Sequence, residues 1–207
     1  MKLELFLIRK ADLWGDYGDV LTSGYAAREP ATCNLLLNRS GPFVPPISFP
    51  DSNFGRVLVV TDSLRQQIEA ETFGSIGFKP VVKERIVHLP YEWEKWDRNA
   101  DLPRVIPEGG EPENYIMDQS HSDEIAAQMP ILWEAVPPVL HCDVECEDTF
   151  SFDKPEKCYF TPSGEQYRGL FRNREDWFDL IADKPTKQWL AKTAGEWLTF
   201  APLIERL

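Results

Sequence analysis

Residues suited to metal or nucleophilic chemistry gather around the motif HCDVEC, which runs from His141 to Cys146, with Cys158 twelve positions further on. Zinc prefers thiolate and imidazole ligands in a tetrahedron, so three cysteines and one histidine would suffice. The Cys-x3-Cys spacing is not that of the usual zinc knuckles, and no second cysteine pair follows. A strand over 139–144 with Cys142 buried explains the same residues more simply. We therefore expect no metal and no other cofactor.

Nucleophilic and acid–base catalysis have no clear signature either. Cys142 and His121 could form a nucleophilic pair, but a chain with four cysteines and three histidines offers several such pairs. The run DVECEDTFSFDKPE, from Asp143 to Glu156, holds six acids and one lysine, without the glycine of a calcium loop. Phosphate-binding and Gly-x-Ser-x-Gly motifs are absent. No catalytic residues are predicted, and the acidic run is either a solvated edge or a docking surface.

Aromatic residues between 90 and 138 offer a second kind of site. Trp93 and Trp96 lie in the motif YEWEKWD, within a segment rich in Trp, Pro and acids. Such rings are usually core anchors, but exposed tryptophans beside acids would resemble a binding hot spot. The candidate partner-binding residues are Trp93, Trp96, Glu111, Glu113, Asp143, Glu145, Glu147 and Asp148.

Two stretches must position these residues, and they resemble each other. Each of the stretches VVTDSLRQQIEAETFGSIGFKPVV and LIADKPTKQWLAKTAGEWLTFAPLI predicts a strand, a helix and a returning strand. Thr61 or Asp62 should cap the first helix, and Asp183 the second. Gly74 and Gly195 should end the two helices. We expect one α+β domain over 1–207, with a mixed sheet built from related β-α-β units at 56–83 and 177–204. A Pro/Trp-rich connecting segment would lie across that sheet, and chance similarity is the alternative to a repeat.

The other expected elements are short. A strand is predicted over 1–10, irregular chain over 11–30, a short strand over 34–37, a proline-rich connector over 41–55, a helix over 122–129 and a strand over 131–136.

The net charge of −12 excludes the usual nucleic-acid binder, which needs basic stripes to neutralise phosphates. The acidity suits a basic partner, or reflects solubility alone. No apolar run is long enough for a membrane helix, and Glu4 interrupts the first apolar stretch, so neither a membrane span nor a signal peptide is expected. These points predict a cytoplasmic protein, in which the four cysteines need not pair.

The first repeat stretch, the linker EGGEPENYIMDQSHS and the ending DWFDLIADKPTKQWLAKTAGEWLTFAPL together resemble a bacterial family of immunity proteins encoded beside polymorphic toxins. The resemblance covers most of 56–207 and is weakest over the first 50 residues. It implies neutralisation of a cognate toxin, basic by our expectation, by direct binding in the cytoplasm. It transfers no functional residues to this chain.

Two other classes of function remain open. One is a small hydrolase-type enzyme that uses carboxylates in the 90–156 region, which predicts a deep pocket with convergent acids. The other is an assembly protein of a phage or secretion system, which predicts a symmetric apolar interface.

Overall fold

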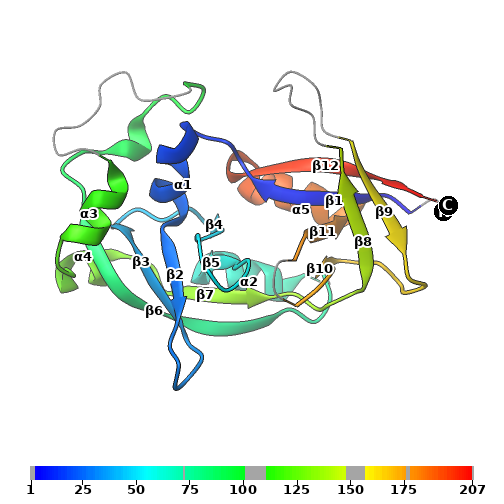
Figure 1. Ribbon diagram of the computed structural model, residues 1–207, viewed down its shortest axis with the longest axis horizontal. Helices are drawn as coiled ribbons and strands as arrows, with labels where there is room; N and C mark the ends of the chain where they lie inside the picture. The colour runs from blue at the N-terminus through cyan, green and yellow to red at the C-terminus, as the bar shows by residue number, and fades with distance from the viewer. Residues whose placement is uncertain (1–2, 72, 101–110, 148–156, 176–177, 207) are drawn as a thin grey trace. The chain divides into compact units, whose positions relative to one another are not determined.

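The computed structural model has an α+β fold with two six-stranded mixed sheets (Figure 1). It describes residues 3–71, 73–100, 111–147, 157–175 and 178–206. Contacts divide the chain into two compact units. The first unit comprises Met1–Ala11, Ile68–Gly77 and Val136–Leu207, and the second comprises Asp12–Gln67 and Phe78–Ala135. Among the described helices, none has the length and apolar character needed to cross a bilayer.

The first unit contains a sheet with the strand order β10-β11-β1-β12-β9-β8. Its elements are β1 (Leu5–Lys10), β8 (Cys142–Cys146), β9 (Cys158–Pro162), β10 (Leu170–Arg172), β11 (Leu180–Asp183), α5 (Lys184–Ala194), η2 (Gly195–Trp197) and β12 (Leu198–Glu205). The sheet curls, because a parallel bridge joins Val139, just before β8, to Arg172 on the opposite edge strand. A cluster that includes Leu7, Phe160 and Phe171 forms a core of this unit.

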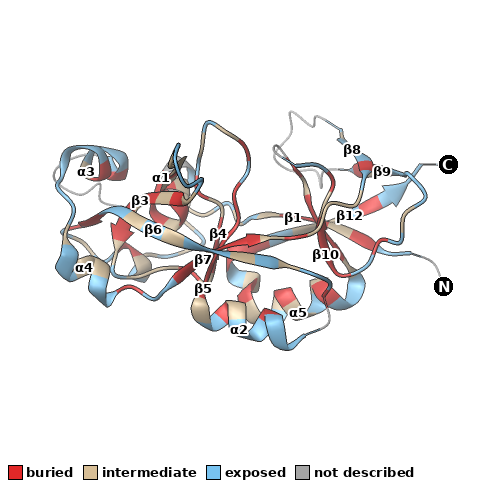
Figure 2. Ribbon diagram, turned by 90° about the horizontal axis from the view of Figure 1, so that it is seen from below, coloured by how far each residue is buried: buried red, intermediate tan, exposed pale blue. Residues whose placement is uncertain are grey.

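The second unit contains a sheet with the order β2-β3-β6-β7-β5-β4. Its elements are α1 (Gly15–Ser23), β2 (Tyr25–Arg28), β3 (Leu35–Gly41), β4 (Ile47–Ser48), β5 (Val59–Thr61), β6 (Gly77–His88), η1 (Trp93–Lys95), α3 (Pro112–Asp118), α4 (Asp123–Gln128) and β7 (Leu132–Val136). Helix α2 (Asp62–Ala70) begins in this unit and ends in the first. All of β5 is buried, α5 buries one face through Thr186, Leu190 and Ala194, and α4 has no buried residue (Figure 2).

The two sheets have the same strand order. Read from its other edge, β4-β5-β7-β6-β3-β2 corresponds strand by strand to β10-β11-β1-β12-β9-β8. The edge pairs β2/β3 and β8/β9 are antiparallel, and the next pairs β3/β6 and β9/β12 are parallel. Both curled edges also meet through a parallel bridge, Tyr25 with Asp51 and Val139 with Arg172. The difference is that β7 follows β6 in the chain, whereas its counterpart β1 precedes every other strand.

Local sequence signals explain several of these elements. The side chain of Asp183 accepts a hydrogen bond of 3.0 Å from the Thr186 amide, and Pro185 occupies the first turn of α5. Ser122 caps α4 in the same way through the amide of Ile125. The predicted strand–helix–strand order is therefore present in both stretches, at β5-α2-β6 and at β11-α5-β12.

Other expectations need correction. The region 11–30 is not irregular, because it forms α1 and β2, and the connector over 41–55 contains β4. The two similar stretches do not share one sheet, since β5 and β6 belong to the second unit's sheet and β11 and β12 to the first. The segment between them contains the expected helix and strand, as α4 and β7, and its described part also includes η1 and α3, which were not expected. The single domain over 1–207 stays a prediction.

A buried cation fixes the end of α1. Arg39 on β3 has no exposed surface, and its guanidinium donates to four backbone carbonyls. The acceptors are those of Leu21 and Thr22 in the last turn of α1, at 3.3 Å each, Ser40 at 3.0 Å and Phe43 at 3.4 Å. Burial lowers the Arg39 pKa to about 10. The arginine supplies the donors that the carboxyl end of a helix lacks.

Candidate functional site

Strand β8 carries a stripe of carboxylates at one edge of the first unit's sheet. Asp143, Glu145 and Glu147 are exposed at alternate positions, whereas Cys142 is buried against the core. Successive side chains of a strand point to opposite faces, so the three acids share the outer face. We call Asp143, Glu145 and Glu147 the acidic stripe. The solvated acidic edge or docking surface expected from the sequence thus lies on the edge strand β8.

The backbone register of the β8/β9 hairpin follows from one hydrogen bond. The Glu147 amide donates to the Lys157 carbonyl at 2.9 Å. Hydrogen-bonded pairs alternate along an antiparallel ladder, so Glu145 also pairs by backbone with β9, and Val144 and Cys146 do not. The amides and carbonyls of these even-numbered residues therefore point away from β9. The Leu140 amide fits the same alternation, because it donates outward to the Arg172 carbonyl at 2.9 Å.

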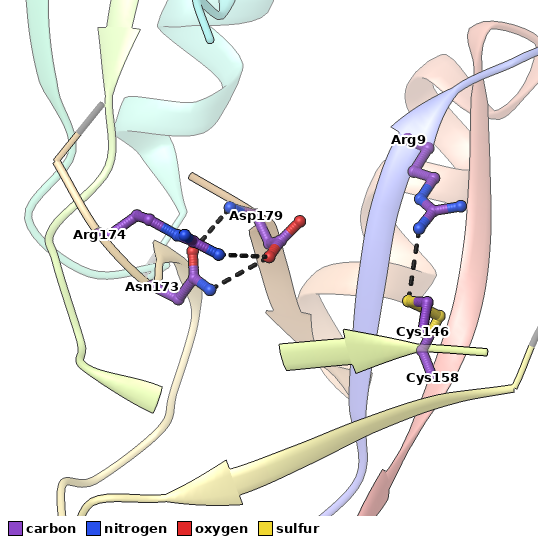
Figure 3. Close-up of a disulfide and its surroundings, with 6 residues drawn as sticks. All are labelled: Arg9, Cys146, Cys158, Asn173, Arg174 and Asp179. Carbon is purple, nitrogen blue, oxygen red and sulfur yellow. Dashed lines mark hydrogen bonds and ion pairs between the residues drawn. A yellow bond between two sulfur atoms is a disulfide. The ribbon is translucent and has the colours of Figure 1, made fainter. Parts of the chain in front are cut away.

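A disulfide closes the end of this hairpin. Cys146 and Cys158 face each other in the register with Cα atoms 4.1 Å apart, as suits a pair without backbone hydrogen bonds, and their sulfurs are bonded. Figure 3 shows Arg9 of β1 reaching this bond, where its Nη2 donates to Cys146 Sγ at 3.4 Å. The expectation that the cysteines need not pair is wrong for these two. Their thiols are consumed, so they cannot serve as thiolate ligands beside Cys142.

A hollow of about 580 Å³ lies beside the stripe. It is lined by His141 to Glu145, by Thr161 to Ser163, and by Asn173 and Arg174. Asn173 follows β10 and is held by Asp179: its Nδ2 donates to Asp179 Oδ2 at 3.1 Å, and the Asp179 amide donates to its Oδ1 at 2.7 Å (Figure 3). These bonds join Asn173 to Asp179, and no described backbone bond joins Asn173 to β8.

Among the described residues, the hollow does not combine a reactive cysteine thiolate with a neighbouring histidine base. Burial raises the pKa of the Cys142 thiol to about 11, with further contributions from Asp179, Asp143 and Glu165, so the thiol is protonated at neutral pH. His141 is the neighbouring strand residue, so its ring points to the opposite face. His121, the other partner considered, belongs to the second unit, where its Nδ1 accepts from the Ile86 amide at 3.0 Å.

The acids of the stripe differ in their partners. Glu145 forms an ion pair with Arg206, and Glu147 accepts a hydrogen bond of 2.8 Å from the Tyr159 hydroxyl, which raises the Tyr159 pKa. The Arg206 guanidinium also lies 4.4 Å from the centre of the Tyr159 ring. Asp143 has no ion pair or side-chain hydrogen bond with the described residues. It is the carboxylate most available to an incoming cation.

The other candidate residues lie in the second unit. Trp93 is 3% exposed and packs edge-on against Trp14 at 5.9 Å, and Trp96 is half-buried in the same aromatic cluster. Both are therefore core anchors, and Trp93 has no face left for a partner. Glu111 and Glu113 are exposed at the start of α3. Asp148 lies outside the described residues, so the structure brings together Asp143, Glu145 and Glu147 alone among the described candidates of the first unit.

A second hollow, also of about 580 Å³, lies in the second unit near His121. Two of its polar side chains have partners: Asn38 Nδ2 donates to Glu84 Oε2 at 2.9 Å, and Arg85 Nη1 donates to the Met117 carbonyl at 2.7 Å. Within the described parts of both units, no three His, Cys, Asp or Glu side chains gather closely enough to hold a metal ion.

Comparison with known proteins returns no match: no family model, no curated protein and no solved structure is similar to this chain.

Proposed function

We propose that this chain is a binding protein that captures a basic protein partner through the acidic stripe of β8. The observation that carries the proposal is the exposure of Asp143, Glu145 and Glu147 on one face of an edge strand. The net charge of −12 adds a long-range attraction for a cationic partner and speeds the encounter.

The specific partner we propose is a bacterial toxin, which the chain neutralises as an immunity protein. The sequence resemblance supports this choice, and so does the fit between an acidic inhibitor and toxins that carry basic surfaces to reach nucleic acid. A neutraliser must capture its toxin before the toxin acts, so electrostatic steering has a direct use.

Co-purification from the native host, at low and at moderate salt, tests the proposal. We expect one protein to be retained at low salt and released as salt rises, because exposed charges are screened. That protein should arrest growth when it is expressed alone and not when it is expressed together with this chain. A salt-insensitive complex would remove the acidic stripe from the mechanism, and the absence of any partner at both salts would favour the hydrolase alternative.

A matched pair of variants locates the interaction. Asp143→Lys reverses the unpartnered charge of the stripe, and Glu71→Lys makes the same charge change after α2. We expect Asp143→Lys to lower the association rate by about tenfold and Glu71→Lys to change it much less, since steering depends on local potential. Equal effects would mean that net charge alone governs binding.

Cytoplasmic residence belongs to the same proposal, and the Cys146–Cys158 bond counts against it, because glutathione and thioredoxin keep cytosolic thiols reduced. Acid quenching of intact cells, followed by alkylation under denaturing conditions and mass analysis, decides between the two. Four alkylated cysteines indicate the cytoplasm, and two indicate an oxidising compartment.

We also propose that the two units are copies of one ancestral unit. The common strand order, the common pair senses and the parallel bridge at both curled edges support this. A unit that carries its own core should fold alone, so residues 12–135 should give a cooperative thermal transition. A fragment that stays unfolded, also when its ends are extended by a few residues, would count against two self-sufficient copies.

A further inference from the structure

We propose that the partner binds by strand addition: an extended segment with basic side chains at alternate positions pairs through its backbone with the open edge of β8. This rests on the proposed function in that the partner is basic, and it adds the chemistry by which the partner is held. Main-chain hydrogen bonds provide affinity in such complexes, and side chains provide specificity.

The first support is a row of backbone groups on β8 that no described backbone atom satisfies. The Leu140 amide and the Pro138 carbonyl are paired with Arg172. The same outward direction recurs at Cys142, Val144 and Cys146, and β8 is the last strand of its sheet. Exposed edges of this kind invite pairing with another chain, so proteins usually shorten or block them.

The second support comes from the counterpart strand in the second unit. Strand β2 ends at Arg28, shortly after its bridge residue Tyr25, and the Arg28 side chain forms a two-pronged pair with the buried carboxylate of Glu134. Strand β8 instead continues well past its own bridge residue, Val139. The second unit therefore closes its curled sheet with the short strand β2. The closure does not need the extra length of β8 in the first unit, and this extra length leaves an exposed edge.

The third support is space next to this edge. The hollow of about 580 Å³ is lined by β8 up to Glu145, by Thr161 to Ser163 at the end of β9, and by Asn173 and Arg174 from the segment after β10. The parallel pairing begun at Arg172 does not continue, because Asn173 bonds to Asp179 and no described backbone bond joins Asn173 or Arg174 to β8. An extended chain can occupy the position that this segment leaves.

Charge selects the side chains of the added strand. Side chains directly across two paired strands lie about 4.5–5.5 Å apart, so those on the outer face would lie beside Asp143 and Glu145. Lys or Arg at these alternate positions would find one unpartnered carboxylate and one whose exposed ion pair with Arg206 is readily exchanged. Arg174, whose side chain is 58% exposed, stands 3.7 Å from Asp179 and is already compensated.

Three synthetic peptides test the backbone contribution. The parent is a capped nine-residue peptide of alternating Lys and Val, and its two derivatives are N-methylated on either the odd or the even amides. An added strand directs one set of amides toward β8, so one derivative should bind at least about tenfold more weakly than the parent, and the other should bind nearly as well. Fluorescence anisotropy gives the affinities, and hydrogen exchange of the Val144 amide should slow when the parent is added.

The outcomes separate this inference from the proposed function. Equal affinity of all three peptides overturns strand addition and leaves the acidic stripe as the binding surface. Strand addition is also overturned, and the acidic stripe remains the binding surface, if the parent peptide does not bind while polylysine binds the wild type and not Asp143→Lys. Failure of both the parent and polylysine overturns both proposals.

A pair of protein variants tests the edge itself. Val144→Pro removes an outward amide without removing a hydrogen bond to β9, and Val144→Ala removes more of the side chain but keeps the amide. We expect Val144→Pro to weaken parent binding by about tenfold and Val144→Ala by less than about twofold. Unchanged hydrogen exchange of the Glu147 amide in Val144→Pro would verify that the hairpin is intact. Unchanged peptide binding by this variant overturns the inference. If the variant does not fold, the peptide series on the wild-type protein decides.

Discussion

Removal of the Cys146–Cys158 disulfide should destabilise the first unit by about 3 kcal/mol. The two cysteines are 12 residues apart, and the loop-closure entropy of a cross-link over about that length corresponds to about 3 kcal/mol at 25 °C. The change is Cys146→Ala together with Cys158→Ala, so that no free thiol remains. The Arg9 guanidinium also loses its sulfur acceptor, which adds to the loss.

Urea denaturation of the oxidised protein, the reduced protein and the double variant measures this loss. Hydrogen exchange of amides in the first unit should follow the transition, because two units can unfold separately. Cys33→Ala is the matched control, since Cys33 is an exposed free cysteine, and it should change stability by less than about 0.5 kcal/mol. A loss below about 1 kcal/mol in the double variant, or four reactive thiols in the unreduced protein, would refute the reasoning.

Three further predictions concern buried polar groups. Arg39→Met leaves four carbonyls without a donor, at a cost of about 1–3 kcal/mol each, and it relieves about 3 kcal/mol of burial cost implied by the lowered Arg39 pKa. Thermal melts should therefore show a net loss of stability of about 4 kcal/mol. Equal or higher stability would mean that the buried charge destabilises the protein. Iodoacetamide should modify Cys33 and spare Cys142 in the folded protein. Burial raises the Cys142 pKa from 9.0 to about 11, so the protonated thiol's contribution to folding stability is complete below pH 9 and is lost towards pH 11. Relative to Cys142→Ala, the loss should be about 2–3 kcal/mol. Arg28→Met should cost about 3–5 kcal/mol in chemical denaturation because it leaves Glu134 buried without its cation, and Arg28→Met with Glu134→Met should recover much of the loss.

Elements encoded by neighbouring residues could be predicted from the sequence. The cap of α5 at Asp183 and the cap of α4 at Ser122 are local signals, and both are confirmed. Helix α1 was not predicted, because its glycines indicate a loop. The structure gives another reason for Gly18: a Cβ there would lie 1.5 Å from the Leu13 carbonyl oxygen, so the glycine permits a close approach of the backbone inside a helix.

Partnerships between distant strands could not be predicted in this way. Alternation identifies β1 as a strand but does not indicate that β11 and β12 flank it. The site shows the same limit. The acids of β8 follow from alternation, whereas Arg206 and Asn173 reach the site from other strands and carry no local signal of their role.

The place of β1 in its sheet sets an order of events during synthesis. Strand β1 lies between β11 and β12, which are translated about 175 and about 190 residues later, roughly 10–40 s at 5–20 residues per second. The second unit's sheet needs no residue beyond Val136, so it can form on the ribosome while β1 still lacks both neighbours. A nascent chain would thus carry an apolar strand, with Leu5 and Leu7 uncovered, through most of translation. Ribosome-associated chaperones that bind short apolar segments would therefore find a target in β1.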